Sequence, residues 1–517
     1  MKKIFITILT VSSLCLSSCS DYLDILPKDK QTSDMFWQSS GDVESILAEG
    51  YSCMRRCVPY MIDWGELRGS SIITLGTGKG RSIQDFKVLP NNEKVKWNDF
   101  YATIGMANAV LKYAPGVMDK DESYKEPQMK SHLTEAYFMR ALTYFYLVRN
   151  YKEVPLITEP YVDDEMPTNV AKSTEADIIT QIKYDIEAAL QTGAAKEMYE
   201  NSWANKCRAT KWALYALMAD VCLWNEDYDE CITYADNLIH TTSGLRPVFM
   251  SEPSQWFQLF YREGDSGGSN ESIFELIFDG DQNPDASKNS PTKIIPYQES
   301  DPSYLYSARM TEDLNTEYLA ENVRTFWGSY AGPENVSTKY PENGLIWKYT
   351  GMGVTGDKEA TRPSSGKNAY SNFIIYRMAD VMLMKAEALI RKGGNENWEE
   401  AISIMNQIRE RSELEPLNES LEDLSEEDLL EKLLHERNME FAAEGKRWYD
   451  LLRLGRQRNF QYKAKFIATI IEYNNTSTAT WLNSVLRDDN AWFLPLPDGD
   501  VKANQLLIQN PYYDVTK

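Results

Sequence analysis

The spacing of apolar residues constrains the fold of this chain more than any other feature of its sequence. In one stretch an apolar or small residue returns every three or four positions, at Leu133, Tyr137, Ala141, Phe145 and Val148. Residues three and four apart share one face of an α-helix. The same spacing recurs around Ile178–Leu190, Ala213–Trp224 and Trp398–Ile408. The chain is therefore expected to be mainly helical.

Local signals mark where some of these helices begin and end. Thr174 and Asp177 have the form of a capping box, and so do Ser425 and Asp428. Gly445 is expected to cap the C-terminal end of the second of these helices. The helices come in pairs with short connections, with Trp or Tyr early and Ala at crossing points, which resembles tetratricopeptide repeats without a strict period.

A long central segment departs from this pattern. Residues 245–371 are dense in Gly, Pro, Asn and Ser, carry interleaved Tyr and Trp, and include a strand-like run at 273–278. A long irregular stretch within a helical protein is more often functional than not. The predicted parts of the chain are a signal peptide at 1–18, a helical part at 19–244, a loop-rich aromatic insertion at 245–371, helix pairs at 372–455 and an irregular tail at 456–517.

The first residues have the form of a secretory signal. Lys2 and Lys3 precede an apolar run over residues 4–16, which is too short for a stable membrane span. The following Leu16-Ser-Ser-Cys19 resembles the lipobox of bacterial lipoproteins, in which the Cys thiol carries acyl chains. Several acyl chains at Cys19 would anchor the protein durably. An ordinary signal peptide cleaved nearby is the alternative.

Charge and cysteine content exclude two classes of protein. The formal net charge is −23, whereas nucleic-acid binding needs a basic surface. Five cysteines remain after Cys15 and Cys19, at Cys53, Cys57, Cys207, Cys222 and Cys231. An odd number cannot pair completely, and no spacing matches a redox or zinc motif. We interpret most of them as small buried apolar residues.

Six motifs in order along the chain resemble the SusD/RagB family of nutrient-uptake lipoproteins. They are Cys19-Ser-Asp-Tyr-Leu-Asp24 with Pro27, Trp64-Gly-Glu-Leu-Arg-Gly69, Arg140-Ala-x-x-Tyr144 with Pro155, Arg377-Met-Ala-Asp380 through Glu387, Glu436-Arg437-x-x-Glu440 through Arg453, and a C-terminal signature of Pro495-Leu-Pro497 and Gln509-Asn-Pro511-x-Tyr513. Glu153 stands where the family usually has Gly. The charged residues of the fifth motif are interpreted as ion-pairing residues that hold helix to helix.

This resemblance implies a SusD-like fold of tetratricopeptide-type helix pairs with a large irregular second part and few strands. It also implies a lipid-anchored protein on the outer-membrane surface of a Gram-negative bacterium. The implied partners are an oligosaccharide or polysaccharide and a TonB-dependent transporter of the SusC type, over which the protein would sit as a lid. No catalytic activity is implied.

The ligand site is predicted from exposed rings, because flat aromatic side chains stack on the apolar faces of sugars. The family has no fixed binding motif, so the candidates come from loops outside the helical stripes. They are Trp97, Trp256, Tyr297, Tyr304, Trp327 and Tyr330, with Arg81 as a partner for hydroxyl groups or an acidic sugar.

Catalytic and metal sites find little support in the sequence. The three histidines, His132, His240 and His435, are expected at the surface or at helix ends, and Met439 replaces the second His of a zinc protease motif. The run Asp279–Asp285 resembles a calcium loop, but Pro284 and Ser290 replace the residues that such a loop needs. No cofactor is expected, and a solvated turn is preferred to a calcium site.

Two other functions remain open at this point. The same architecture could bind a peptide or another nutrient. The protein could also be a surface glycosidase, although no pair of carboxylates is singled out by the sequence.

Overall fold

The structure is a computed structural model. It describes residues 33–69, 71–74, 79–161, 167–201, 203–260, 268–279, 286–294, 308–310, 316–317, 323–324, 346, 348–349, 351–355, 358–361, 369–473 and 479–514.

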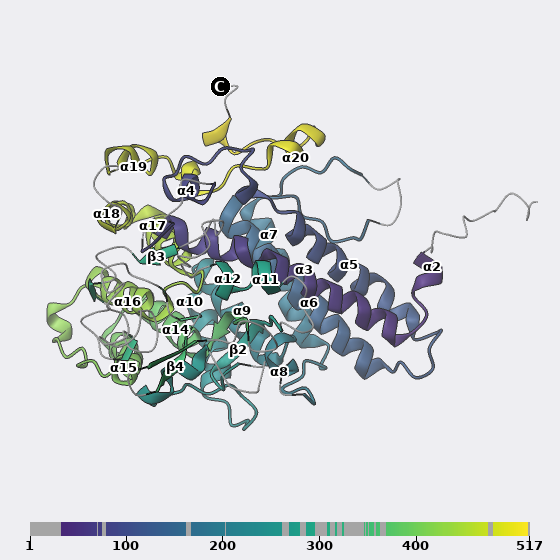
Figure 1. Ribbon diagram of the computed structural model, residues 1–517, viewed down its shortest axis with the longest axis horizontal. Coiled ribbons are helices and arrows are strands. Elements are labelled where there is room, and N and C mark those ends of the chain that lie inside the picture. The colour runs from purple at the N-terminus through teal and green to yellow at the C-terminus, as the bar shows by residue number, and fades with distance from the viewer. Residues whose placement is uncertain are drawn as a thin grey trace, which may run out of the picture.

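The N-terminal part is a series of helices in which each long helix packs against the next (Figure 1). α3 packs against α5, α5 against α6, α6 against α7, α7 against α9, and α9 against α10. The helices are α2 (Ser33–Phe36), α3 (Ser40–Glu66), α4 (Lys79–Gln84), α5 (Asn98–Val117), α6 (Glu126–Tyr151), α7 (Glu175–Gln191), α8 (Ala204–Cys207), α9 (Lys211–Trp224) and α10 (Tyr228–Ile239).

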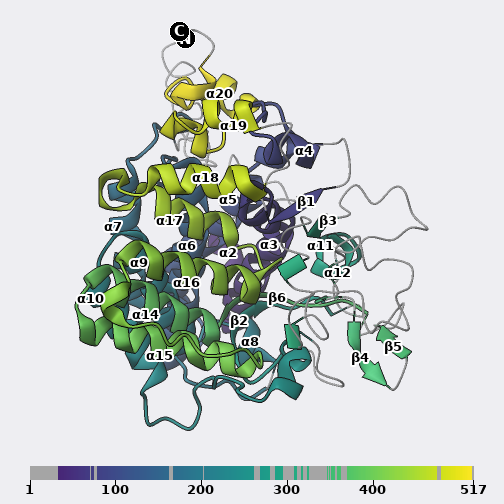
Figure 2. The ribbon, with the colours of Figure 1, turned by 90° about the vertical axis from the view of Figure 1, so that its left-hand side faces the viewer.

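The C-terminal part continues this series, because α10 packs against α14 and α14 against α15 and α16. Figure 2 shows α18, α17, α16 and α14 stacked along one side of the molecule. The chain then returns to its beginning, since α17 packs on α3. These helices are α14 (Met378–Lys392), α15 (Asn395–Arg411), α16 (Glu426–Phe441), α17 (Arg447–Phe460), α18 (Lys463–Tyr473), α19 (Ala479–Val485) and α20 (Asp498–Ala503).

The described strands form three antiparallel pairs, β1 with β3, β2 with β6, and β4 with β5. In Figure 2 the pairs β1–β3 and β4–β5 lie with α11 and α12 on the side away from the helix stack. The strands are β1 (Ile72–Thr74), β2 (Ser272–Leu276), β3 (Ala308–Met310), β4 (Gly351–Thr355), β5 (Lys358–Thr361) and β6 (Phe373–Arg377). The short helices are α11 (Ala286–Asn289), α12 (Pro291–Ile294), η1 (Leu67–Gly69), η2 (Glu93–Val95), η3 (Pro253–Leu259), η5 (Leu421–Asp423), η7 (Asp489–Trp492) and η8 (Pro511–Tyr513).

The helix signals of the sequence are largely confirmed. The stripe from Leu133 to Val148 lies in α6, and nearly all sides of its second half are buried because α3, α5, α7 and α9 surround it. Ser425 caps α16 in a capping box with Asp428. Thr174 accepts a hydrogen bond from the backbone N–H of Asp177 at 3.2 Å.

Two predictions about the C-terminal part are wrong. Gly445 does not cap α16, because α16 ends at Phe441; Gly445 lies in the following turn with φ of +75°. The segment 456–517 is not an irregular tail, since it contains α18, α19 and α20. Phe466 and Ile470, four residues apart, bury one face of α18, and the sequence reading overlooked this pair.

The N-terminal and C-terminal parts meet along a buried seam. A Cβ added to Gly65 would lie 2.0 Å from the carbonyl oxygen of Gly445, so the two backbones touch here. Glu66 accepts the Gly445 N–H at 2.6 Å. Arg68 donates to the Trp492 carbonyl oxygen and to Asn150 Oδ1, both at 2.7 Å. Burial raises the pKa of Glu66 to about 8 and lowers the pKa of Arg68 to about 10.

Four of the charged motif residues, on α16 and in the turn that follows it, form ion pairs inside the protein, as predicted. Their partners lie on other elements rather than on α16 itself. The pairs are Glu436 with Arg324 and Arg409, Arg437 with Asp380 and Asp450, Glu440 with Arg377 and Arg411, and Glu444 with Arg377 and Lys348. Burial alone would raise the pKa of Glu440, but Arg411, Arg377 and Arg324 hold it at about 2.

The five cysteines outside the N-terminal segment are free thiols, and all but the half-buried Cys207 are buried, as expected. Among the helices that the structure describes, none is both long and apolar enough to cross a membrane.

Candidate ligand-binding site

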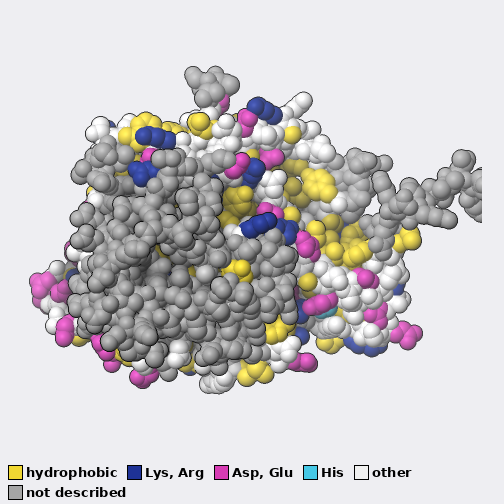
Figure 3. Space-filling view, viewed as in Figure 1, with side chains coloured by type: hydrophobic (Ala, Val, Ile, Leu, Met, Phe, Trp, Pro, Cys, Tyr) yellow, Lys and Arg dark blue, Asp and Glu magenta, His cyan; other side chains and the backbone are white. Residues whose placement is uncertain are grey.

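A cavity of about 400 Å³ lies between α5, the chain around residues 155–161 and the C-terminal segment that begins with α20. We call it the aromatic pocket. Its described rings are Trp97, Tyr101 and Tyr161. Polar side chains join them at Asn98, Asn108, Glu159, Thr168, Asp500 and Asn504. On the face drawn in Figure 3, apolar side chains reach the surface between the positions of α20 and α5.

Trp97 stands immediately before α5 and is fixed from two directions. Its indole Nε1 donates to Asp500 Oδ2 at 2.6 Å, which ties the start of α5 to α20. Its ring lies 5.4 Å from that of Tyr101 and 5.1 Å from that of Tyr151. The Tyr101 hydroxyl donates to the Pro155 carbonyl oxygen at 2.8 Å. The two rings are therefore held rigidly and are mostly covered.

Tyr161 offers more ring surface than the other aromatic residues of the pocket. The residue is 51% exposed, and its hydroxyl donates to the Pro167 carbonyl oxygen at 3.1 Å. Asn98 is also exposed, and its side chain makes no hydrogen bond to a described residue. These two side chains can contact a ligand without breaking an internal bond.

The Arg140 motif supports the wall of the aromatic pocket. Arg140 pairs with Asp185 at 2.6 Å and donates to Asn108 Oδ1 at 2.8 Å. Asn108 Nδ2 then donates to the Ile157 carbonyl oxygen at 3.0 Å. The motif residues thus hold the chain that follows Pro155 against α5. Their role is to position the pocket rather than to contact its contents.

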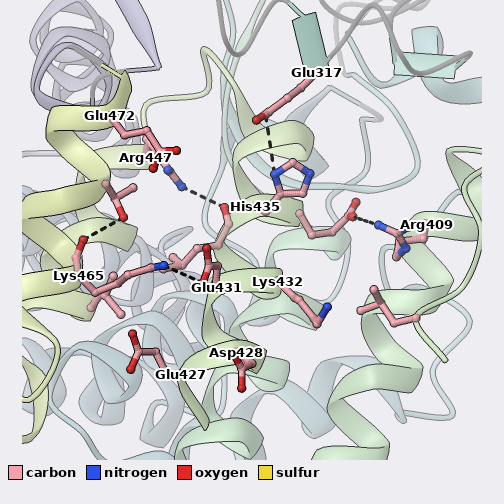
Figure 4. Close-up of a pocket in the computed structure, with 15 residues that line it drawn as sticks. Glu317, Arg409, Glu427, Asp428, Glu431, Lys432, His435, Arg447, Lys465 and Glu472 are labelled. Atoms are coloured by element: carbon pink, nitrogen blue, oxygen red, sulfur yellow. Dashed lines mark hydrogen bonds and ion pairs between the residues drawn. The ribbon is translucent and has the colours of Figure 1, made fainter. Parts of the chain in front are cut away.

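A second cavity, of about 510 Å³, lies among α16, α17, α18 and the end of α15 (Figure 4). We call it the charged cleft. Its charges are mostly paired with one another or with neighbours: Glu431 with Lys465 at 2.7 Å, Glu436 with Arg409 at 3.3 Å, and Lys432 with Glu419 at 2.5 Å. Its described lining includes no Trp, Tyr or Phe, so it lacks a stacking platform for a sugar.

The structure places three of the predicted ligand residues in different surroundings. Trp97 lines the aromatic pocket. Arg81 is partly exposed on α4, where its Nε lies 3.0 Å from Asp85 Oδ1, and it does not line that pocket. The prediction that Trp256 is an exposed ligand residue is wrong. Trp256 is 1% exposed, and the guanidinium of Arg411 lies 4.9 Å from its ring centre. Its ring covers the buried ion pairs and is not available to a ligand.

The remaining predicted residues cannot be compared with the structure. Cys19, Tyr297, Tyr304, Trp327 and Tyr330 lie outside the described residues, and most of the possible calcium loop, 280–285, does as well.

Sequence reasoning missed Tyr101, Tyr161 and Asp500. Tyr101 looked like an ordinary helix residue. Asp500 is 403 positions from the Trp97 that it holds, so no local pattern connects the two.

One prediction about histidine is wrong. His132 is buried, with Nδ1 2.9 Å from the Tyr124 hydroxyl and Nε2 3.1 Å from Glu44. It faces inward because α6 is covered on most sides. His240 ends α10 and is exposed, as expected, and His435 is partly exposed in the charged cleft.

One group of potential metal ligands occurs among the described residues, formed by Cys222, Asp227 and Glu230. Lys183 Nζ lies 2.9 Å from Asp227 and 2.6 Å from Glu230. The ammonium group already supplies the positive charge there, so the group gives no support for a metal.

Comparison with known proteins identifies two family profiles in this chain. Residues 320–513 match the profile of the SusD family. Residues 21–223 match a profile described as "Starch-binding associating with outer membrane". A SusD-like protein of Formosa agariphila is 25% identical over 489 residues, which cover 87% of this chain and 91% of that protein. The starch-binding protein SusD of Bacteroides thetaiotaomicron is 22% identical over 595 residues, covering 99% of both.

Solved structures show the same fold. A SusD superfamily protein of Bacteroides vulgatus superposes with a TM-score of 0.72 at 19% identity, over 92% of this chain and 99% of the other. A laminarin-binding SusD-like protein superposes with a TM-score of 0.65 at 20% identity, over 92% of this chain and all of the other.

Proposed function

Because the chain belongs to the SusD family of outer-membrane-associated glycan-binding proteins, we propose that it captures a glycan at the cell surface and delivers it to a TonB-dependent transporter of the SusC type. The observation that carries this proposal is the aromatic pocket. It combines an exposed ring, Tyr161, with the amide of Asn98, which bonds to no described side chain or backbone group, and the carboxylate of Asp500. Its volume of about 400 Å³ is within the usual range of small-ligand sites.

Capture would rest on stacking and on hydrogen bonds to hydroxyl groups. The ring of Tyr161 offers an apolar face to the C–H groups of a sugar, while its hydroxyl stays bound to Pro167. Asn98 can both donate and accept, and Asp500 can accept. Because α5, α20 and the Arg140 contacts hold the pocket in place, binding would order few additional groups.

We infer that the protein does not cleave the glycan it binds. A glycosidase needs two opposed carboxylates, one of them shielded from water so that it keeps a proton. In the aromatic pocket Glu159 is exposed, 3.4 Å from Lys112, and Asp500 accepts the indole N–H of Trp97. Neither carboxylate has the surroundings of a general acid.

The proposed location at the outer membrane rests on the N-terminal sequence. Acylation of Cys19 after signal cleavage would tether the protein to the outer membrane, beside its transporter. The profile matched by residues 21–223, with its association with the outer membrane, supports this location.

The proposal is tested by titration calorimetry and by gel electrophoresis in polysaccharide, with Tyr161→Ala compared to Tyr184→Ala. Tyr184 is a matched control, because it is a similarly exposed tyrosine on α7 and outside the aromatic pocket. We expect Tyr161→Ala to weaken glycan binding at least about fivefold and Tyr184→Ala to leave it unchanged. Absence of binding to every glycan, or release of reducing sugar by the purified protein, would contradict the proposal.

The predicted residues outside the described part of the chain call for a parallel experiment. Trp327→Ala, and then Tyr297→Ala, Tyr304→Ala and Tyr330→Ala, are expected to weaken binding without lowering the melting temperature. If none of them changes affinity, the prediction that these four residues contact the glycan is wrong.

A further inference from the structure

The charged side chains that line the aromatic pocket all have one sign. Glu159 and Asp500 are acidic, and the described lining contains no Lys, Arg or His. A ligand that enters the pocket therefore meets negative charge and no positive partner. By contrast, the charged cleft mixes carboxylates with Lys and Arg.

Two cations that bond to residues of the pocket lining are already engaged. Lys112 lies 3.4 Å from Glu159, and both side chains are exposed, so this pair neutralises Glu159 only partly. Arg140 lies behind Asn108, where it is buried and bound to both oxygens of Asp185 at 2.6 and 2.8 Å. Neither side chain can reach a ligand carboxylate without losing its present partner.

The free hydrogen-bonding capacity of the pocket suits hydroxyl groups. Asp500 Oδ2 accepts the Trp97 indole N–H, and Asp500 Oδ1 accepts no hydrogen bond from a described residue. An ionised carboxylate can only accept, so it requires a donor such as a sugar hydroxyl. A ligand carboxylate or sulfate at this position could not donate a hydrogen bond to Asp500, because its oxygens are also acceptors.

We propose that the aromatic pocket selects neutral glycans and rejects uronic-acid, sialic-acid and sulfated ones, an inference that rests on the glycan-binding function proposed above. Two like charges about 4 Å apart repel by about 1 kcal/mol even at the dielectric of bulk water, which corresponds to about fivefold in affinity for each carboxylate. The formal net charge of −23 adds a longer-range repulsion that salt screens. Acidic side chains are spread over the described part of the face in Figure 3.

The test is titration calorimetry at low salt with paired probes of equal length. The neutral probes are β-1,3-gluco-, malto-, cello- and xylo-oligosaccharides, and the anionic probes are oligogalacturonate and oligomannuronate. We compare the wild type with Asp500→Asn, which keeps an oxygen for the Trp97 N–H. The matched control is Asp498→Asn, on the same helix, whose carboxylate pairs with Lys502 and does not line the pocket.

The wild type is expected to bind at least one neutral probe more than tenfold tighter than any anionic probe. Asp500→Asn should reduce this preference about fivefold, and Asp498→Asn should leave it unchanged. If Asp500→Asn lowers the melting temperature, Glu159→Gln replaces it, because the Glu159 side chain is exposed and its one partner among the described residues is Lys112.

Three outcomes overturn the inference while leaving the proposed function in place. They are tightest binding of an anionic probe, a preference that neither pocket variant alters, and glycan binding that Tyr161→Ala does not weaken. Failure of every probe to bind contradicts the proposed function itself, so the two failures are distinguishable.

Discussion

Arg377 contacts three carboxylates in the interior of the protein. Its guanidinium lies 2.5 Å from Glu440, 2.9 Å from Glu444 and 3.0 Å from Glu271, and none of these side chains reaches solvent. Charges in such a place are tolerated only when each has a partner, because removing one leaves the others buried and unpaired. The guanidinium also lies 4.4 Å from the ring centre of Phe441. This single residue therefore joins β6, α16 and the chain before β2.

Replacement of Arg377 by Met should be strongly destabilising. Three carboxylates would lose a shared partner, and we expect the free energy of unfolding to fall by about 3–5 kcal/mol. Arg81→Met is the control, since the Arg81 side chain is 43% exposed and Asp85 is its one ion-pair partner among the described residues; its loss should cost less than about 1 kcal/mol. Urea denaturation of both variants measures the difference. Equal effects would show that burial does not set the strength of these pairs.

Glu66 gives the seam a dependence on pH. Burial raises its pKa from 4.5 to about 8 in the folded protein, whereas the unfolded chain releases the proton near its usual value. The native state therefore holds more protons between these limits. Glu66 stabilises the fold most below about pH 4.5, and this contribution is lost as the pH rises through 8, by up to about 1.4 kcal/mol per unit.

The variant Glu66→Gln isolates this effect, because an amide keeps an oxygen for the Gly445 N–H and does not ionise. Urea denaturation of the wild type and the variant at pH 5, 7 and 9 should show the variant gaining relative stability as the pH rises. A difference that stays constant with pH would mean that Glu66 ionises alike in both states.

At the scale of secondary structure, one close approach of two elements depends on the absence of side chains. The end of α3 and the turn after α16 approach through Gly65 and Gly445. Gly445 also has φ of +75°, which other residues adopt at a cost. The Glu-Leu-Arg motif and the long motif of α16 and α17 meet at this contact, which accounts for glycine in both.

Gly65→Ala should therefore disrupt the seam. The added Cβ would lie 2.0 Å from the Gly445 carbonyl oxygen, so one backbone must move. Gly116→Ala is the matched control in α5, where nothing lies within 4 Å, and it should stabilise the helix by up to about 1 kcal/mol. Differential scanning fluorimetry should show a clear fall in melting temperature for the first and none for the second. Similar melting temperatures would rule out close backbone contact.

Local periodicity predicted the helical elements well, because each helix follows from residues three and four apart. It identified the stripe of α6 and the caps of α7 and α16. It failed where distant partners decide the outcome. His132 looked like a surface residue until the neighbours of α6 covered it, and Trp256 looked like a loop residue until the ion pairs filled the space beneath its ring. Of the predicted ligand residues that the structure describes, only Trp97 lines the aromatic pocket, and it is mostly buried there. The sequence could not identify the rest of the pocket, because the pocket joins segments far apart in the chain.

Across the whole molecule, the two ends of the chain share one core. Arg68 reaches Trp492, and Asn150 Nδ2 donates to the Tyr449 hydroxyl at 2.8 Å. If the N-terminal and C-terminal parts separated, these buried polar groups would lose their hydrogen-bond partners.

We therefore expect the described helices to unfold in a single cooperative transition. Far-ultraviolet circular dichroism and tryptophan fluorescence should give coincident urea curves, because Trp64 and Trp97 in one part and Trp448 and Trp492 in the other report on the same event. Two separated transitions would mean that the parts fold independently.

The proposed membrane anchor at Cys19 concerns the whole protein, and Cys19→Ala tests it. Without its thiol the chain cannot be acylated, so we expect the variant to leave the membrane fraction and to appear in a soluble fraction. Wild-type protein should label with a radioactive fatty acid. Retention of Cys19→Ala in washed membranes would require another means of attachment.

Because Trp97 is bonded to Asp500, the proposed ligand site would be incomplete in any chain that ends before α20. A protein clipped before α20 keeps all three rings but lacks the carboxylate that orients the first of them. Because synthesis proceeds from the N-terminus, Trp97 is made early, and its partner Asp500 is added only when nearly the whole polypeptide has been made. Under the proposed function, the pocket would become able to bind a glycan only late in synthesis, and a copy that ends before α20 would not compete with complete copies for the ligand.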